Sequence, residues 1–151
     1  MKVLVDTNVI LDSLLNRSAF SIHSKAIFDL AEQKRIIGNV SASAITDIFY
    51  IAYKEFKNSE RVYNMVEKLT TIKVALVSET TIASALALRW RDFEDAVQYI
   101  VAKENNAAYI ITRNIQDFSS GNIPAVTPEQ FMQHIADMQK NRQQLTINAF
   151  V

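Results

Sequence analysis

The sequence contains no cysteine, only two glycines and two prolines, and no excess of charge of either sign. Without cysteine the chain can form neither disulfides nor thiolate metal sites, and it has no Cys nucleophile. The scarcity of glycine and proline predicts mostly regular structure with tight connections. Because 16 basic residues balance 16 acidic ones, no overall field attracts nucleic acid or an acidic membrane. Any such partner must bind a local patch.

Long apolar runs are also absent, although apolar residues make up 49% of the chain. None approaches the roughly 18 residues needed to cross a bilayer. The N-terminus does not read as a secretory signal, because Asp6 and Asp12 interrupt its apolar stretch. We therefore expect a cytoplasmic protein without a membrane partner. One folded domain is expected over residues 1–137, followed by a tail, residues 138–151, that is either disordered or adds a strand to a partner.

Apolar runs of strand length alternate with segments of helical periodicity along the chain. The expected strands are residues 2–5, 35–40, 73–78, 108–112 and 123–128, the second with a weak pattern and the last short. The expected helices follow Asp6 and cover residues 21–35, 41–56, 60–69, 81–88, 91–106 and 128–139. Because the strands are apolar on both faces, an α/β fold with a parallel sheet covered by helices on each side is predicted.

Polar residues follow two of these strands directly. In open parallel sheets, ligands bind beyond the carboxyl ends of the strands. Asp6 follows the first strand, and residues 112–114 follow the strand AYII. Both stretches are therefore expected on one rim, with Asp117 nearby. Asp95 lies in the first turn of its helix, which could begin at the same rim.

Each acidic residue also has a purely structural explanation. Asp6 and Asp92 precede helical segments and can act as N-caps. Asp95 would favour the positive end of its helix. Asp47 lies beside an apolar stripe, where solvent exposure is the default, and Asp117 lies in a turn-like stretch. Taken singly, none of these positions identifies a site.

Taken together, the stretches MKVLVDTNVILD, SAITDIFY, DFEDAVQ, IITRNIQDF and IPAVTPEQF resemble the PIN-domain ribonucleases. Within that family the resemblance is to the VapC-like toxins of bacterial and archaeal toxin–antitoxin pairs. It covers residues 1–132. It implies a three-layer α/β/α fold with a central parallel sheet of about four to five strands, and an acidic cluster that binds Mg²⁺ or Mn²⁺.

The resemblance also implies roles for individual residues. Asp6, Asp95 and Asp117 match the acidic metal ligands of the family. Asp47 matches a position that more often holds Glu, so its carboxylate is one methylene shorter. These four are the expected catalytic residues. The supporting residues implied by the resemblance are Asn8, Asp92, Thr112 and Asn114.

Such a cluster of carboxylates suits phosphodiester hydrolysis. Like charges raise carboxylate pKa values, so the cluster lowers stability until a cation neutralises it. Hard oxygen ligands suit Mg²⁺, and one or two such ions can lower the pKa of a water that attacks phosphate. RNA would be held by local cations, and single-stranded or looped RNA is the favoured target because its backbone is accessible. Arg113 is the foremost candidate. The others, for which a solvated surface charge is the default interpretation, are Arg17, Lys54, Arg89 and Arg91.

Partners follow from the resemblance, which implies a homodimer and an inhibitory antitoxin whose peptide lies across the rim. The aromatic stretch FYIAYKEF belongs either to a dimer interface or to the core. A rival hypothesis is a catalytically degenerate protein on this fold that acts as an RNA- or protein-interaction module. The Asp47 substitution motivates that alternative.

Overall fold

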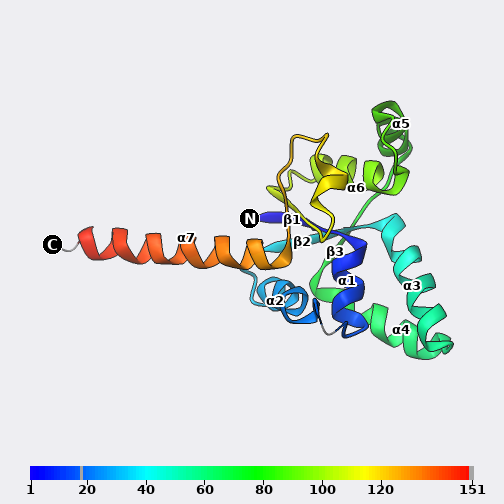
Figure 1. Ribbon diagram of the computed structural model, residues 1–151, viewed down its shortest axis with the longest axis horizontal. Helices are drawn as coiled ribbons and strands as arrows, with labels where there is room; N and C mark the ends of the chain where they lie inside the picture. Colours follow the sequence, from blue (N-terminus) through cyan, green and yellow to red (C-terminus); the bar gives the residue numbers. More distant parts are fainter. Residues whose placement is uncertain (18, 150–151) are drawn as a thin grey trace.

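A computed structural model describes residues 1–17 and 19–149 (Figure 1). A five-stranded parallel sheet has the order β3-β2-β1-β4-β5. Its strands are β1 (Lys2–Val5), β2 (Ile37–Ser41), β3 (Lys73–Ala75), β4 (Tyr109–Ile111) and β5 (Ala125–Val126). The helices are α1 (Thr7–Leu14), α2 (Ser21–Glu32), α3 (Ala42–Phe56), α4 (Ser59–Glu67), α5 (Glu79–Leu88), α6 (Phe93–Glu104) and α7 (Pro128–Ala149). Two 3₁₀ turns, η1 (Lys68–Thr71) and η2 (Ile115–Phe118), complete the described elements.

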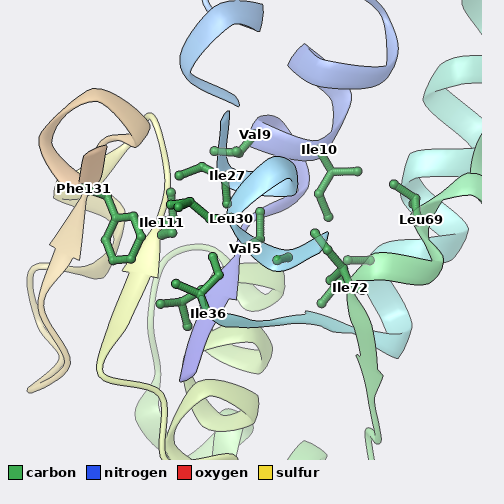
Figure 2. Packing of buried hydrophobic residues seen from close by; sticks show 14 of the residues in the cluster. Val5, Val9, Ile10, Ile27, Leu30, Ile36, Leu69, Ile72, Ile111 and Phe131 are labelled. Carbon is green, nitrogen blue, oxygen red and sulfur yellow. The ribbon is translucent and has the colours of Figure 1, made fainter. Parts of the chain in front are cut away.

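The sheet separates two apolar cores, because successive side chains of a strand point to opposite faces. Val3, Val5 and Ile111 pack on one face against apolar residues of α1, α2, α3 and α7 (Figure 2). Leu4 and Ile110 point to the other face and pack against α5 and α6. The predicted parallel sheet with helices on both sides is therefore confirmed.

The central strand β1 pairs with β2 on one side and with β4 on the other. Val5 lies opposite Ile111, and the backbone N–H of Asp6 donates to the carbonyl of Ile111 at 3.0 Å. This register places Asp6 beside Thr112, the first residue after β4. The two polar stretches expected on one rim do lie next to each other.

Strand β2, whose sequence pattern was weak, lies inside the sheet between β1 and β3. Its pattern is interrupted by Asn39, which is 2% exposed and donates from Nδ2 to the carbonyl of Val3 at 3.3 Å. Strand β3 ends at Ala75, earlier than expected, and Ser78 is the N-cap of α5. The Ser78 hydroxyl accepts a hydrogen bond from the Thr81 N–H at 3.1 Å, and the Thr81 hydroxyl caps the Ser78 N–H in return.

The last helix is longer than the sequence suggested. A helix over residues 128–139 was expected, whereas α7 continues to Ala149 and its C-terminal half extends away from the rest of the chain (Figure 1). The predicted tail, residues 138–151, is helical up to Ala149, and residues 150–151 lie outside the described residues. None of the helices in residues 1–17 and 19–149 is long and apolar enough to cross a membrane.

Candidate active site

Asp6 stands at the carboxyl end of β1 and is 4% exposed. Its Oδ2 accepts hydrogen bonds from the Thr112 hydroxyl at 2.7 Å and from Asn8 Nδ2. Its Oδ1 accepts from Gln98 Nε2 at 3.0 Å. The backbone of Asp6 has N-cap conformation, but its side chain makes no capping hydrogen bond. Capping therefore does not explain this carboxylate, which is instead oriented by neutral donors from three parts of the chain.

The loop after β4 is tied to the start of α1. Asn8 Oδ1 accepts a hydrogen bond from the Arg113 N–H at 3.2 Å. The Thr112 hydroxyl, which is fully buried, accepts from the Asn114 N–H at 2.9 Å and from Asn8 Nδ2 at 3.3 Å. These bonds fix the positions of the predicted supporting residues Asn8 and Thr112 around Asp6, while the side chain of Asn114 is exposed.

Asp92 is the N-cap of α6, as the sequence predicted. Its Oδ1 accepts hydrogen bonds from the N–H groups of Glu94 at 2.8 Å and Asp95 at 3.3 Å. The cap sets the first turn of α6, and with it the two acidic residues of that turn, against the end of β1.

Sequence reasoning missed Glu94 and Gln98. Glu94 Oε1 accepts from the Thr7 hydroxyl at 2.9 Å and from Gln98 Nε2 at 3.3 Å. Gln98 is 1% exposed, so its amide bridges the carboxylates of Glu94 and Asp6 in a buried position. Their spacing of four residues, which places both side chains on one helix face, was the available signal.

The carboxylates on α6 and η2 lie close enough to Asp6 to affect one another. Burial, together with the negative charges of Asp92, Asp6 and Asp117, raises the pKa of Asp95 to about 7. Asp117 itself is exposed within η2. Burial also raises the pKa of Asp6, while the hydrogen bonds from Thr112 and Gln98 lower it. Three distant parts of the sequence thus bring negative charge to one rim.

Asp47 reaches the same rim from α3. Burial raises the pKa of Glu94. Among the neighbouring negative charges, Asp47 contributes most to this increase. Asp47 is half-buried. The charges of the four acidic residues predicted to be catalytic therefore act on one another or on Glu94 along one rim.

The chemistry of this donor set fits a hard divalent cation. All of its charged groups are carboxylates, and none of them forms an ion pair with a basic residue in the described part of the chain. Within residues 1–17 and 19–149, no three acidic or His side chains converge closely enough to hold an ion by themselves. Mg²⁺ usually keeps several waters and needs only one or two protein carboxylates. The candidate ligands are Asp6, Asp95 and Asp117, of which one or two would contact the ion directly.

Arg113, the predicted substrate contact, has partners within the protein. Its Nε lies 3.2 Å from Oδ2 of Asp12, and its guanidinium carbon lies 4.6 Å from the centre of the Phe20 ring. Asp12 is fully buried and is also 3.4 Å from Nη1 of Arg17. Among the other candidate cations, Lys54 has its Nζ 4.4 Å from the centre of the Tyr50 ring, and both residues lie on α3.

An open cavity of about 980 Å³ adjoins the acidic rim. Asp95 and Asp117 form one side of it, and the connection from α5 to α6, which includes Arg89 and Arg91, forms another. The rim therefore opens onto a space of the size of a ligand site.

Known proteins with this fold include ribonucleases and toxins. The chain is 25% identical over 135 residues to Ribonuclease VapC1 of Aquifex aeolicus, covering 86% of this chain and 92% of that protein. VapBC2 of Rickettsia felis, solved bound to a DNA fragment from its promoter, superposes with a TM-score of 0.66 at 16% identity, covering 84% of this chain and 98% of the other. VapC20 of Mycobacterium tuberculosis, a Sarcin-Ricin loop cleaving toxin, superposes with a TM-score of 0.64 at 16% identity, covering 79% of this chain and 95% of the other.

These structural similarities support the three-layer fold, and the family follows from the sequence match. Residues 2–116, which include Asp6, Asp47, Asp95 and the segment 112–114, match the PIN domain family. That match spans well over half of the chain and ends one residue before Asp117. The chain belongs to the PIN domain family.

Proposed function

We propose that this protein is a divalent-metal-dependent endoribonuclease that hydrolyses RNA phosphodiester bonds, and that it is the toxin of a type II toxin–antitoxin pair. The observation that carries the proposal is Asp6, a buried carboxylate at the end of β1 that has carboxylate neighbours and no cationic partner in the described residues. Membership of the PIN domain family and the similarity to a protein named Ribonuclease VapC1 support the same activity.

The roles of the residues follow from their contacts. Asp6, Asp95 and Asp117 would hold Mg²⁺ or Mn²⁺, and Asp47 and Glu94 add negative charge beside them. When bound, the cation supplies positive charge and Lewis acidity for the attack of water on a phosphodiester.

The neutral residues around Asp6 act by positioning. Thr112, Asn8 and Gln98 direct both oxygens of Asp6 toward fixed places, so that the carboxylate need not reorganise during the reaction. Asn114 anchors the Thr112 hydroxyl through its N–H, and Asp92 holds the first turn of α6. Substitution of such outer partners of a metal site typically lowers metal affinity or activity by about 10–100-fold.

We propose a protein antitoxin as a partner, because the similar solved structures include a toxin–antitoxin complex from Klebsiella pneumoniae, with a TM-score of 0.63 at 23% identity over 83% of this chain and 97% of the other. Since RNA is the proposed substrate, we place the activity in the cytoplasm.

We also propose a homodimer that uses the outer face of α3. Tyr50 and Tyr53 of the stretch FYIAYKEF are 57% and 44% exposed, whereas Ala52 between them is fully buried. The stretch thus contributes both to the core and to a surface that a second copy can cover. A monomer in light scattering at micromolar concentration would contradict this part of the proposal.

The test is cleavage of a mixed panel of single-stranded, structured and transfer RNAs in Mg²⁺, Mn²⁺ or EDTA. Wild type is compared with Asp6→Asn and with a control, Asp29→Asn, which makes the same change at an exposed position of α2. We expect metal-dependent cleavage by wild type and the control, and a loss of more than about 100-fold in Asp6→Asn, since it alters a metal ligand.

Failure of wild type to cleave any RNA in saturating metal would contradict the proposal. Titration with Mn²⁺ then separates the alternatives. Equal Mn²⁺ affinity of wild type and Asp6→Asn would favour the catalytically degenerate interaction module, for which the Asp in place of Glu at position 47 is the motivating observation.

A further inference from the structure

We propose that the cavity beside the acidic rim is the subsite for the RNA strand next to the cleaved bond, with two arginines for phosphates and a tryptophan for a base. This inference rests on the proposed ribonuclease function. The residues of the cavity that carry it are Arg89, Trp90, Arg91, Asp95 and Asp117.

An acidic rim needs nearby cations to bind a polyanion. The carboxylates that would hold the metal repel the phosphates of RNA, and the chain has no net positive charge to compensate. Arg17 and Arg113 are both paired with the buried Asp12. Cations free to meet phosphate must therefore come from elsewhere near the rim.

Arg89 and Arg91 meet that need. Both are exposed, both line the cavity, and neither makes an ion pair with any residue that the structure describes. Arg89 ends α5 in a left-handed conformation, with φ 56°, and Arg91 directly precedes Asp92, the cap of α6. This short connection leads from the cations to Asp95 within four residues, so phosphates held by the arginines lie next to the proposed metal site.

Trp90, between the two arginines, lies half-buried in the wall of the cavity. Its ring packs against Tyr99 at 4.9 Å and against Phe118 at 6.3 Å between centroids. Tyr99 is fixed in turn, because its hydroxyl accepts from the Asn122 N–H at 3.1 Å. A side chain at Gly121 would come within 2.4 Å of the Tyr99 ring, so the glycine permits this packing.

A rigid indole beside two arginines is the combination that single-stranded nucleic acid uses. Stacking of a base on an aromatic side chain stabilises binding without sequence preference, and the cations follow the backbone. Because Trp90 is already held by Tyr99 and Phe118, little side-chain entropy is lost when a base stacks on it. The cavity therefore suits one nucleotide of a single strand, with its neighbouring phosphates on Arg89 and Arg91.

Trp90 is the only tryptophan of the chain, so its fluorescence reports on this cavity alone. The experiment titrates wild type in EDTA, where no cleavage occurs, with a labelled mixed-sequence single-stranded RNA of about 12 nucleotides. Label anisotropy gives the Kd at several salt concentrations, while indole emission shows whether the strand reaches the cavity. We expect quenching of Trp90 that saturates with the same Kd.

The double variant Arg89→Gln/Arg91→Gln removes both cations. We expect its Kd to rise by about 10-fold or more at low salt, and its salt slope to fall by about 1.4, or 0.7 per lost phosphate contact. The matched control is Arg35→Gln/Arg142→Gln, which removes the same charge at exposed positions outside the cavity and should change neither value. Circular dichroism and thermal unfolding establish that all three proteins are folded.

The outcomes separate this inference from the proposed function. If the double variant binds with the Kd and salt slope of wild type, or if bound RNA leaves Trp90 emission unchanged, the subsite is wrong. Metal-dependent cleavage by wild type would then still support the ribonuclease. If wild type neither binds nor cleaves any RNA, both proposals fail.

Discussion

Asp6 and Asp12 lie six residues apart, both are nearly or fully buried, and yet they have opposite surroundings. Asp12 faces two arginines, with Nε of Arg113 at 3.2 Å and Nη1 of Arg17 at 3.4 Å. Asp6 faces only hydroxyl and amide donors, and the nearest charges in the described residues are other carboxylates. Burial raises the pKa of both residues, but at Asp12 the arginines oppose the shift, whereas at Asp6 only neutral hydrogen bonds do.

This contrast shows how a fold can hold one buried carboxylate for stability and another for function. The negative charge of Asp12 is neutralised within the chain, so the ion pair between Asp12 and Arg113 can connect α1 to the loop after β4. The charge of Asp6 is hydrogen-bonded but not neutralised, which leaves it available to an external cation. Burial alone would not distinguish the two residues; the sign of the neighbouring charges does.

The largest effect on stability is expected from Asp12→Asn. The substitution leaves two arginines without their buried counter-charge, and we expect the free energy of unfolding to fall by about 3 kcal/mol, the lower end for a broken buried pair, because Arg17 is 38% exposed. Asp6→Asn loses hydrogen bonds but relieves repulsion from Asp95, so its change should stay within about 1.5 kcal/mol. Urea unfolding of the metal-free proteins measures both values.

In RNA cleavage activity the order of the two variants should be reversed. Asp6→Asn is expected to be folded and inactive, while Asp12→Asn, assayed below its unfolding transition, retains most of its activity. Greater destabilisation by Asp6→Asn than by Asp12→Asn would contradict the distinction drawn between a functional and a structural carboxylate.

A smaller effect is expected from Gln98→Met, which keeps the volume but removes the amide that bridges Asp6 and Glu94. We expect about a 10-fold loss of metal-dependent cleavage and a higher Mn²⁺ dissociation constant, because Asp6 loses one of its positioning donors. The control is Gln133→Met on the exposed face of α7, where the amide donates to Asp137 Oδ1 at 3.0 Å, away from the rim. Unchanged Mn²⁺ affinity in Gln98→Met would show that its bridge is not needed to position Asp6.

The sequence predicted those parts of the site that depend on local chain geometry. Asp6 is placed by the end of a strand, and Asp92 caps its helix through N–H groups two and three residues away. Thr112 joins Asp6 because neighbouring parallel strands end at one edge. Each of these placements follows from periodicity and capping within a short stretch.

The remaining parts depend on how distant elements pack. The bond between Thr7 and Glu94 joins residues 87 positions apart, and that between Gln98 and Asp6 spans 92. Their partners are decided by the way α6 lies across β1 and α1, which no local pattern encodes. The weak pattern of β2 has the same origin, since the polar Asn39 is satisfied by Val3 on the adjacent strand.

The smallest expected effect is a pH dependence of stability that belongs to the Asp6 side of the molecule. The pKa of Asp95 is about 7 in the folded metal-free protein and has an ordinary value of 3.8. Between these values the folded state binds a proton that the unfolded state has released. The contribution of Asp95 to stability is therefore highest below the lower pKa, falls as the pH rises towards 7, and levels off above it. Because Asp95 is partly exposed, solvent screens its neighbours, and we expect Tm in EDTA to fall by on the order of 2–4 °C between pH 5 and pH 8.

Two changes should flatten the dependence of Tm on pH, because both act on the titration of Asp95. Asp95→Asn removes the titrating group, and saturating Mg²⁺ favours its charged form, which lowers the pKa that burial and repulsion had raised. The slope is reduced rather than abolished, because burial also raises the pKa values of Asp6, Asp12 and Glu94. Mg²⁺ acts only on the carboxylates at the rim, so the part of the slope due to Asp12 should persist in its presence. A profile that Mg²⁺ leaves unaltered would mean that the rim carboxylates do not bind the ion.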